Sequence, residues 1–211
     1  ASTGLPSPLG AKTYWPVYKV ADRLGCAVAV HGGAHEGFGM DHFNVYAPVH
    51  ALGHPFGQMV SFGNMIFNGV CDNFPNVKFG YLEAGVAWLL MCLERFDRSY
   101  ETHKHYDLDG ELIRLRDGES VSRYIKRNIK EGHIFVGCEG EEPELAYAIR
   151  EVGAEPFVFS TDYPHEVTIE MCRHEIQELL ETEDISNDAK DAVLYRNAQR
   201  FYNLAAVPVS A

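Results

Sequence analysis

Polar side chains that could do metal or acid–base chemistry stand at four points where a short apolar run of the sequence ends. Burying a charge beside an apolar strand costs free energy unless the charge is paired or binds a metal. One imidazole and three carboxyl groups in such positions therefore indicate a metal site, a general acid–base site, or both. The four residues are His31, Glu83, Glu139 and Asp162.

The histidine and the aspartate each have a functional and a structural interpretation. His31 precedes Gly32 and Gly33, and glycines leave room for a ligand close to the backbone. A histidine at a strand end can also be a hydrogen-bonded structural residue. Asp162 lies before a turn, where aspartate often caps the chain, and it could equally be a metal ligand or a general base. The coincidence of the two favours the functional interpretation of both.

The two glutamates leave more alternatives open. Glu83 could be a ligand, a general base, or the ion-pair partner of Arg95 or Arg98 on the helix expected to follow it. Glu139 opens an acidic run before a predicted helix, where negative charge favours the helix dipole. It could therefore serve the site or only the helix.

The elements that must position these residues follow from hydrophobic periodicity. Short apolar runs alternate with helical patterns, which is typical of βα units on a parallel sheet. The predicted strands are Cys26–Val30, Val77–Leu82, Ile134–Val136 and Pro156–Phe159. The predicted helices are 13–24, 56–73, 85–100, 121–130, 143–152, 169–180 and 186–204, and His31 to about His54 is expected to be a loop. Because ligands bind at the carboxyl ends of parallel strands, the four polar residues should meet at one edge of the sheet.

Composition narrows the class of protein. The 211 residues are 46% hydrophobic with a formal net charge of −12, which predicts one globular domain over residues 1–211 and argues against nucleic acid or an anionic membrane surface as partner. No apolar run is long enough to span a bilayer, and no signal peptide is visible. Five widely spaced cysteines without a CxxC pair indicate reduced thiols in a cytoplasmic protein.

Several chemical motifs are absent or incomplete. The sequence has no P-loop, GxSxG or HExxH motif, and Gly37-Phe-Gly39 lacks the third glycine of a dinucleotide-binding turn. His103 and His105 are two residues apart in a charged segment, so on a helix they would face different ways. The apolar neighbours of Cys138 favour a core thiol over a nucleophile.

Four segments together resemble the amidohydrolase-related family, which includes aminocarboxymuconate semialdehyde decarboxylase and γ-resorcylate decarboxylase. The resemblance runs from about Leu9 to Leu204. The segments that carry it are AVHGG at 29–33, NFPNVKFGYLEAG at 73–85, FSTDYPH at 159–165 and RNAQRFY at 196–202.

The resemblance implies a (β/α)8 barrel with one divalent metal, usually zinc and sometimes manganese, at its C-terminal mouth. It implies that His31 and Asp162 are metal ligands. Glu83 stands where the family has a catalytic histidine, and the family's first-strand motif, His or Glu, any residue, then His, is absent. The four strands would then be strands 5 to 8, and the chain the C-terminal half of a barrel. The chain length agrees with a half barrel, because a whole barrel takes about 250 residues. An independent four-stranded open sheet is the alternative.

The expected function is that of a metal-dependent hydrolase or decarboxylase acting on a small, aromatic or cyclic carboxylate. His31 and Asp162 would hold the metal, Asp162 could double as general base, and Glu83 would move a proton. Residues expected to support them from nearby are His54, Glu139, Tyr163 and His165. The alternatives are a barrel glycosidase using Glu83 and Glu139, and a binding or scaffold barrel without metal. A half barrel would expose an apolar inner face and two sheet edges, so a second copy or a separate N-terminal half is the expected partner.

Overall fold

The centre of the fold is a parallel sheet of four strands, β1 (Ala27–Val30), β2 (Lys78–Tyr81), β3 (Ile134–Cys138) and β4 (Phe157–Phe159), in that order. The computed structural model describes residues 1, 3–33, 37–165 and 167–205. In register, Val30 lies opposite Tyr81, Tyr81 opposite Val136, and Val136 opposite Phe157. The predicted parallel βα arrangement is therefore confirmed, and the carboxyl ends of the four strands share one edge.

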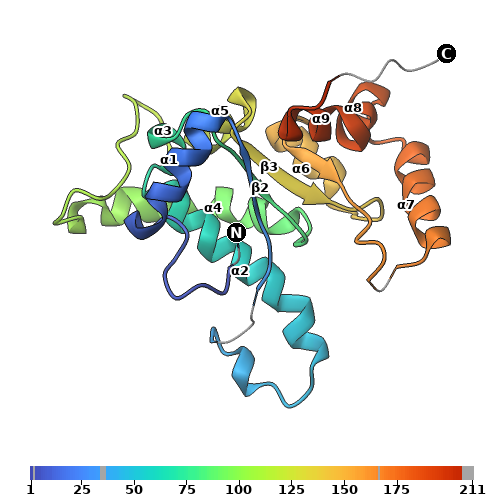
Figure 1. The fold of residues 1–211 in the computed structure, drawn as a ribbon, viewed down its shortest axis with the longest axis horizontal. Coiled ribbons are helices and arrows are strands. Elements are labelled where there is room, and N and C mark those ends of the chain that lie inside the picture. Colours follow the sequence, from blue (N-terminus) through green and yellow to red (C-terminus); the bar gives the residue numbers. More distant parts are fainter. Residues whose placement is uncertain (2, 34–36, 166, 206–211) are drawn as a thin grey trace.

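Helices connect the strands and cover one face of the sheet (Figure 1). The helices before β3 are α1 (Trp15–Leu24), α2 (Ala47–Phe67), α3 (Val70–Asn73), α4 (Ala87–His103) and α5 (Val121–Glu131). Those after it are α6 (Leu145–Val152), α7 (Ile169–Glu181), α8 (Asn187–Asp191) and α9 (Asn197–Tyr202). Short 3-10 turns are η1 (Lys12–Tyr14), η2 (Met40–His42) and η3 (Lys104–Tyr106), and η4 (Ala192–Arg196) is a π-helical turn.

Helix ends follow the expected capping chemistry. The Ser120 hydroxyl accepts a hydrogen bond from the Arg123 amide at the start of α5, and Gly132 ends the helix at φ +85°. Thr168 caps α7 in the same way, through the Met171 amide. Side-chain oxygens at these positions satisfy amides that have no partner inside the helix, and glycine adopts positive φ at low cost. The predicted limits of these helices hold to within a few residues.

The start of α2 corrects the sequence prediction. Residues 47–55 were expected to be loop, yet the helix begins at Ala47, with a proline in its first turn and Pro55 in its interior. Pro48 fits there because the first amides of a helix have no internal partner. The consequence is that His50 and His54 lie one helical turn apart, on one face of α2.

The C-terminal region also differs from the single helix expected over 186–204. It consists of α8, η4 and α9, which lie together beside β4 (Figure 1). Asn197, at the start of α9, is buried, and its Nδ2 donates to the carbonyls of Ala154 at 2.7 Å and Phe157 at 2.8 Å. These bonds fix α9 to the beginning of β4.

The second face of the sheet is covered by α9 near the starts of the strands. Phe201 packs with Phe135 and Val158, and all three are buried. A Cβ at Gly80 would lie 2.6 Å from the Phe201 ring, so this strand position accommodates no larger residue without movement. The apolar inner face that a half barrel was expected to expose is thus partly covered by the chain's own C-terminal helix.

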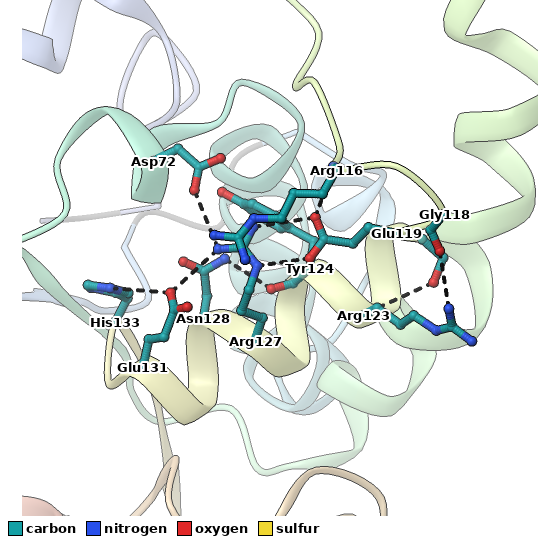
Figure 2. Close-up of polar contacts among 11 residues, drawn as sticks. Asp72, Arg116, Gly118, Glu119, Arg123, Tyr124, Arg127, Asn128, Glu131 and His133 are labelled. Atoms are coloured by element: carbon teal, nitrogen blue, oxygen red, sulfur yellow. Dashed lines mark hydrogen bonds and ion pairs between the residues drawn. The ribbon is translucent and has the colours of Figure 1, made fainter.

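An ion-pair network joins α3, α5 and the loop before α5 (Figure 2). The Arg127 guanidinium contacts Glu119 at 2.8 Å, Glu131 at 3.4 Å and Asp72 at 3.9 Å, and lies over the Tyr124 ring. The hydrogen bond from Arg127 lowers the pKa of Glu119. The network lies near the amino ends of β2 and β3, away from the edge that carries the polar residues, and ties helices together.

The edge strand β1 has backbone partners beyond its own sheet. The Ala1 amine donates to the Ala29 carbonyl, His31 donates to the Ala1 carbonyl, and Thr3 donates to the His31 carbonyl. The carboxyl end of β1, where His31 stands, is therefore held from both sides.

The five cysteines are all free thiols, as predicted, and burial raises the pKa of Cys138 well above its ordinary value, which fits a core thiol.

Within residues 3–33, 37–165 and 167–205, no helix has the length and apolar character needed to cross a bilayer.

Candidate metal centre

Glu83 lies at the middle of a group of imidazole and carboxyl side chains. Its Oε2 pairs with Nε2 of His31, and its Oε1 lies 3.8 Å from Nε2 of His54. Nitrogen and oxygen atoms of the three side chains lie within 4.8 Å of one another. Two imidazoles and a carboxylate are a donor set suited to zinc and to other divalent transition metals.

His54 reaches this group because of the glycine next to His31. A Cβ at Gly32 would lie 1.8 Å from Nδ1 of His54, so only glycine lets the imidazole approach the backbone so closely. The room that the sequence assigned to a ligand at Gly32 is therefore filled by the His54 ring. The His31 and His54 rings stand edge to face, with centroids 5.7 Å apart.

Gln58, one turn after His54 on α2, fixes the ends of two strands. Its Nε2 donates to the carbonyl of Val30 at 3.0 Å and to that of Leu82 at 2.8 Å. These carbonyls directly precede His31 and Glu83. The fully buried amide thus holds the two side chains in register.

Asp162 forms a second group with Glu83 and His165, again with donor atoms within 4.8 Å of one another. Nδ1 of His165 lies 3.0 Å from Asp162 Oδ1. Both carboxylate residues adopt left-handed backbone conformations, with φ of +59° at Glu83 and +55° at Asp162. Non-glycine residues enter this region at a free-energy cost and are common at functional sites.

A cleft of about 340 Å³ opens beside these groups at the carboxyl edge of the sheet. Among the described residues that line it, four are carboxylic acids and none is Lys or Arg. The lining residues are His50, Ala51, His54, Pro55, Glu83, Ala84, Gly85, Glu139, Thr161, Asp162, Val167 and Glu175. The site is therefore strongly acidic, with imidazoles on one wall.

The acidic environment changes how the carboxyl groups titrate. Burial raises the pKa of Glu139, and the nearby negative charges of Asp162 and Glu83 raise it further. Burial also raises the pKa of Glu175, helped by the charge of Glu139. A raised pKa allows a carboxyl group to carry a proton closer to neutral pH, as a general acid must.

Glu142 connects the loops after β2 and β3. Its Oε2 accepts a hydrogen bond from the Val86 amide and its Oε1 one from the Glu139 amide, both at 2.7 Å. Burial raises the pKa of Glu142 to about 7, although these two bonds act to lower it. Glu142 belongs to the acidic run that Glu139 opens before α6, and its two hydrogen bonds position the loops carrying Glu83 and Glu139.

Glu175 on α7 was not anticipated. It is nine-tenths buried and lines the cleft, and its Oε2 has no hydrogen-bond partner within the part of the chain that the structure describes. The available signal was its spacing, because Glu175 lies three residues after Cys172 and four before Leu179, on the apolar side of the predicted helix.

The structure brings most of the predicted residues together, with one rearrangement. His31 and Asp162 both lie near Glu83, but no group of three donors among the described residues contains the two of them. The ion-pair partners of Glu83 there are His31 and His54, rather than Arg95 or Arg98. Tyr163 is 55% exposed and does not line the cleft.

The family model described as amidohydrolase matches residues 2–204, nearly the whole chain. The chain belongs to the amidohydrolase family. No curated protein matches the chain. Family membership does not favour the glycosidase alternative.

Solved structures confirm the fold type. A 5-carboxyvanillate decarboxylase from Sphingomonas paucimobilis matches with a TM-score of 0.73 and 21% identity, over 94% of this chain and 56% of that one. A dihydroxybenzoic acid decarboxylase from Polaromonas sp. JS666, with bound manganese, matches with a TM-score of 0.65 and 16% identity. This match covers 97% of this chain and 57% of the decarboxylase. A 5-carboxyvanillate decarboxylase from Novosphingobium aromaticivorans, complexed with manganese, matches with a TM-score of 0.70 and 14% identity. This match covers 94% of this chain and 53% of the decarboxylase.

The chain thus spans about half the length of these structures. They are TIM-barrel proteins, so the four βα units have the fold of part of a (β/α)8 barrel, as expected. The numbering of the strands as 5 to 8 stays a prediction. At 14–21% identity the likeness establishes the fold, and the chemistry must be argued from this chain's own residues.

Proposed function

We propose that this chain carries the metal-binding part of a hydrolase or decarboxylase that acts on a small aromatic or cyclic carboxylate. The observation that carries the proposal is the group of His31, His54 and Glu83 at the carboxyl ends of β1 and β2. In (β/α)8 proteins this end of the sheet is where chemistry takes place. The decarboxylases that share the fold act on aromatic carboxylates, which supports the substrate class.

The donor atoms fit a divalent metal ion. His31, His54 and Glu83 offer the three protein ligands that catalytic sites usually supply, and Asp162 offers a further oxygen nearby. Zinc suits the imidazole-rich group. Manganese, present in two of the similar structures, suits the carboxylates.

A bound metal would polarise a carboxylate or carbonyl group of the substrate, or lower the pKa of a bound water. The protein must then move a proton. Asp162, hydrogen-bonded to His165, is placed to accept one, and Glu83 faces the same cleft. Glu139, whose pKa is raised, can donate a proton to a ring carbon in decarboxylation or to a leaving group in hydrolysis.

The partners follow from surface and charge. The outer strands of the sheet are β1, whose outer side is paired only with the short segment around Ala1 and Thr3, and β4, so we propose that a second copy, or a segment supplying the remaining strands, completes the barrel. The net charge of −12 supports a small-molecule substrate rather than nucleic acid or a membrane, and the free thiols support a cytoplasmic location.

The test measures metal content and turnover. We expect His31→Ala and Asp162→Asn to lower the manganese or zinc retained after desalting, by mass spectrometry of the metal. His174→Ala, in an exposed group with Glu141 and Glu178, should not. A panel of aromatic acids, assayed with and without added metal, should show metal-dependent release of carbon dioxide or of hydrolysis product. Unchanged metal content in both variants would refute the assignment, and a wild-type chain that neither retains metal nor turns over any acid would favour the metal-free scaffold alternative.

A further inference from the structure

The long helix α2 has one face that is exposed, apolar and free of formal charge. Its 21 residues include no Asp, Glu, Lys or Arg, although 23% of the whole chain is charged. The opposite face packs against the fold through its buried residues, which are Gly53, Gly57, Gln58, Ser61, Phe62, Met65 and Ile66. The first half of α2 projects from the body of the molecule (Figure 1). The exposed face is therefore open to a partner.

Large apolar side chains recur along the exposed face at helical spacing. Leu52, Phe56 and Val60 follow one another four residues apart, and each is 38–39% exposed. Residues three or four positions apart stand on the same side of a helix, so Val49, three before Leu52, continues the row. The exposed Val45 lies four residues earlier. We call these five residues the α2 stripe, and its spacing of three and four is what one helix presents to another along a packing seam.

A groove of about 400 Å³ runs beside the α2 stripe. Phe56 and Val60 form part of one wall, and the other wall comes from the segments before α1 and before α2. The large apolar residues of that second wall are Leu5, Pro6, Pro8, Phe38 and Met40. Because none of the described lining residues is charged, the groove offers an apolar recess for side chains that project from another helix.

We propose that the α2 stripe is the surface on which a second copy of this chain docks, with the two α2 helices antiparallel about a two-fold axis. A two-fold interface brings the same patch of both subunits together. Leu52, at the middle of the stripe, then meets its own counterpart, and Val49 lies opposite Phe56 of the partner subunit. The inference does not rest on the proposed metal chemistry. It also differs from completion of the barrel, because α2 lies in the helix layer and not at the outer strands β1 and β4.

The neutral character of this face indicates which partner it fits. Each chain carries a formal net charge of −12, so two copies repel each other over most of their surfaces. They meet at least cost through a face without carboxylates. A basic protein would be drawn to the acidic surfaces rather than to α2. A helix that binds a membrane surface carries Lys or Arg on its polar face, and α2 has neither.

The apolar area matches what a dimer of ordinary size requires. The exposed members of the stripe, with Leu5 and Phe38 beside the groove, are between 38% and 62% exposed. Since a large side chain covers about 150–250 Å², these exposed fractions leave about 400–500 Å² of apolar surface. Each partner of a standard-size interface contributes about 800 Å², of which about 56–58% is apolar. The α2 stripe and its groove therefore supply the apolar part of one such interface.

The first experiment measures the molar mass of the full chain in solution. Sedimentation equilibrium over a wide range of concentration should show a monomer–dimer equilibrium for the wild type. Leu52→Asp should weaken the dimer by at least about a hundredfold, because it places two carboxylates in the apolar seam of each dimer. Leu24→Asp is the matched control, since it makes the same change at a leucine on α1 that is 64% exposed, and it should leave the dimer unchanged. Circular dichroism should show that both variants are folded.

The second experiment tests the antiparallel arrangement by cross-linking. Leu52→Cys lies at the two-fold axis, so mild oxidation should join two chains through a disulfide. Val60→Cys should not cross-link, because at 1.5 Å per residue its two copies lie roughly 20 Å apart along antiparallel helices. The wild type, with its exposed Cys26, gives the background of the reaction.

Each other outcome overturns the proposal. A wild-type chain that stays monomeric leaves the stripe to another occupant, such as the segment that supplies the remaining strands. A monomer that binds phosphatidylcholine vesicles makes a lipid surface the occupant. A dimer that survives Leu52→Asp, or that Leu24→Asp weakens instead, forms elsewhere on the molecule. Cross-linking of Val60→Cys as fully as of Leu52→Cys contradicts the antiparallel pairing. None of these results bears on metal binding, so the proposed function is tested separately.

Discussion

Glu142 makes the stability of this protein depend on pH near neutrality. The side chain bridges the Val86 and Glu139 amides, and burial raises its pKa to about 7 from an ordinary value of 4.5. Because the folded pKa is raised, the folded state binds more protons than the unfolded state between these two values. The contribution of Glu142 to the free energy of unfolding is therefore greatest below pH 4.5 and is lost as the pH rises through about 7.

The size of the effect follows from the shift. A difference of about 2.5 pKa units, at 1.36 kcal/mol per unit, corresponds to about 3 kcal/mol. Glu142→Gln removes this titration. It also costs a constant amount, about 1–3 kcal/mol, because the glutamine amide can accept only one of the two backbone hydrogen bonds. The stability advantage of the wild-type protein over Glu142→Gln should therefore shrink by up to about 3 kcal/mol between pH 5 and pH 8.

The assay is urea unfolding of the wild type and Glu142→Gln at half-unit steps across that range. Glu183→Gln, the same chemical change at an exposed position after α7 that does not contribute to the Glu142 shift, is the matched control and should show a constant difference from wild type. If the Glu142→Gln difference is constant with pH, or grows as pH rises, the assignment of a buried, mostly protonated carboxyl group is wrong.

Three further substitutions test the packing that holds the site. Asn197→Ala leaves the Ala154 and Phe157 carbonyls without their donor and should cost about 2–4 kcal/mol in urea unfolding; a loss under about 0.5 kcal/mol would contradict the hydrogen bonds. Phe201→Ala should cost about 3–5 kcal/mol and raise binding of a hydrophobic dye, because it uncovers the second face of the sheet. Gly140→Ala places a Cβ 2.1 Å from the Glu175 carbonyl oxygen, so it should lower the unfolding midpoint and shift Glu175; unchanged thermal stability would show that the two segments are not in contact.

The strands and the residues at their ends could be predicted from the sequence because both depend on local pattern. Apolar runs such as Ala27–Val30 form strands, and parallel strands bring their carboxyl ends to one edge. This is enough to gather His31, Glu83 and Asp162. The beginning of α2 could not be predicted, because Gly53 and Pro55 weaken a helix locally and tertiary contacts decide whether it forms.

The residues that surround the ligands depend on contacts between distant segments. Gln58 matters because α2 crosses the ends of β1 and β2, and Glu175 because α7 returns over the loop at Gly140. Gly32 was recognised as a place of close approach, but the group that approaches is an imidazole of the chain itself. The sequence shows that a position such as Gly32 must allow a close approach. Which group approaches, here the His54 imidazole, is known only from the placement of α2 against the strands.

The two ends of the sheet have different roles: one packs the helices together and the other carries the candidate site. At the amino ends, Asn197 and Phe201 fasten the C-terminal helix to β4 and to the second face of the sheet, and Arg127 joins α3 to α5. At the carboxyl ends, acidic groups crowd a cleft and two carboxylate residues adopt costly backbone conformations. The strands are three to five residues long, so about 7–13 Å separates their first and last Cα atoms, which is close to the 7–10 Å within which substitutions usually couple. The packing at one end can therefore provide the free energy that allows the strained, charged arrangement at the other, and substitutions at the two ends are close enough to couple.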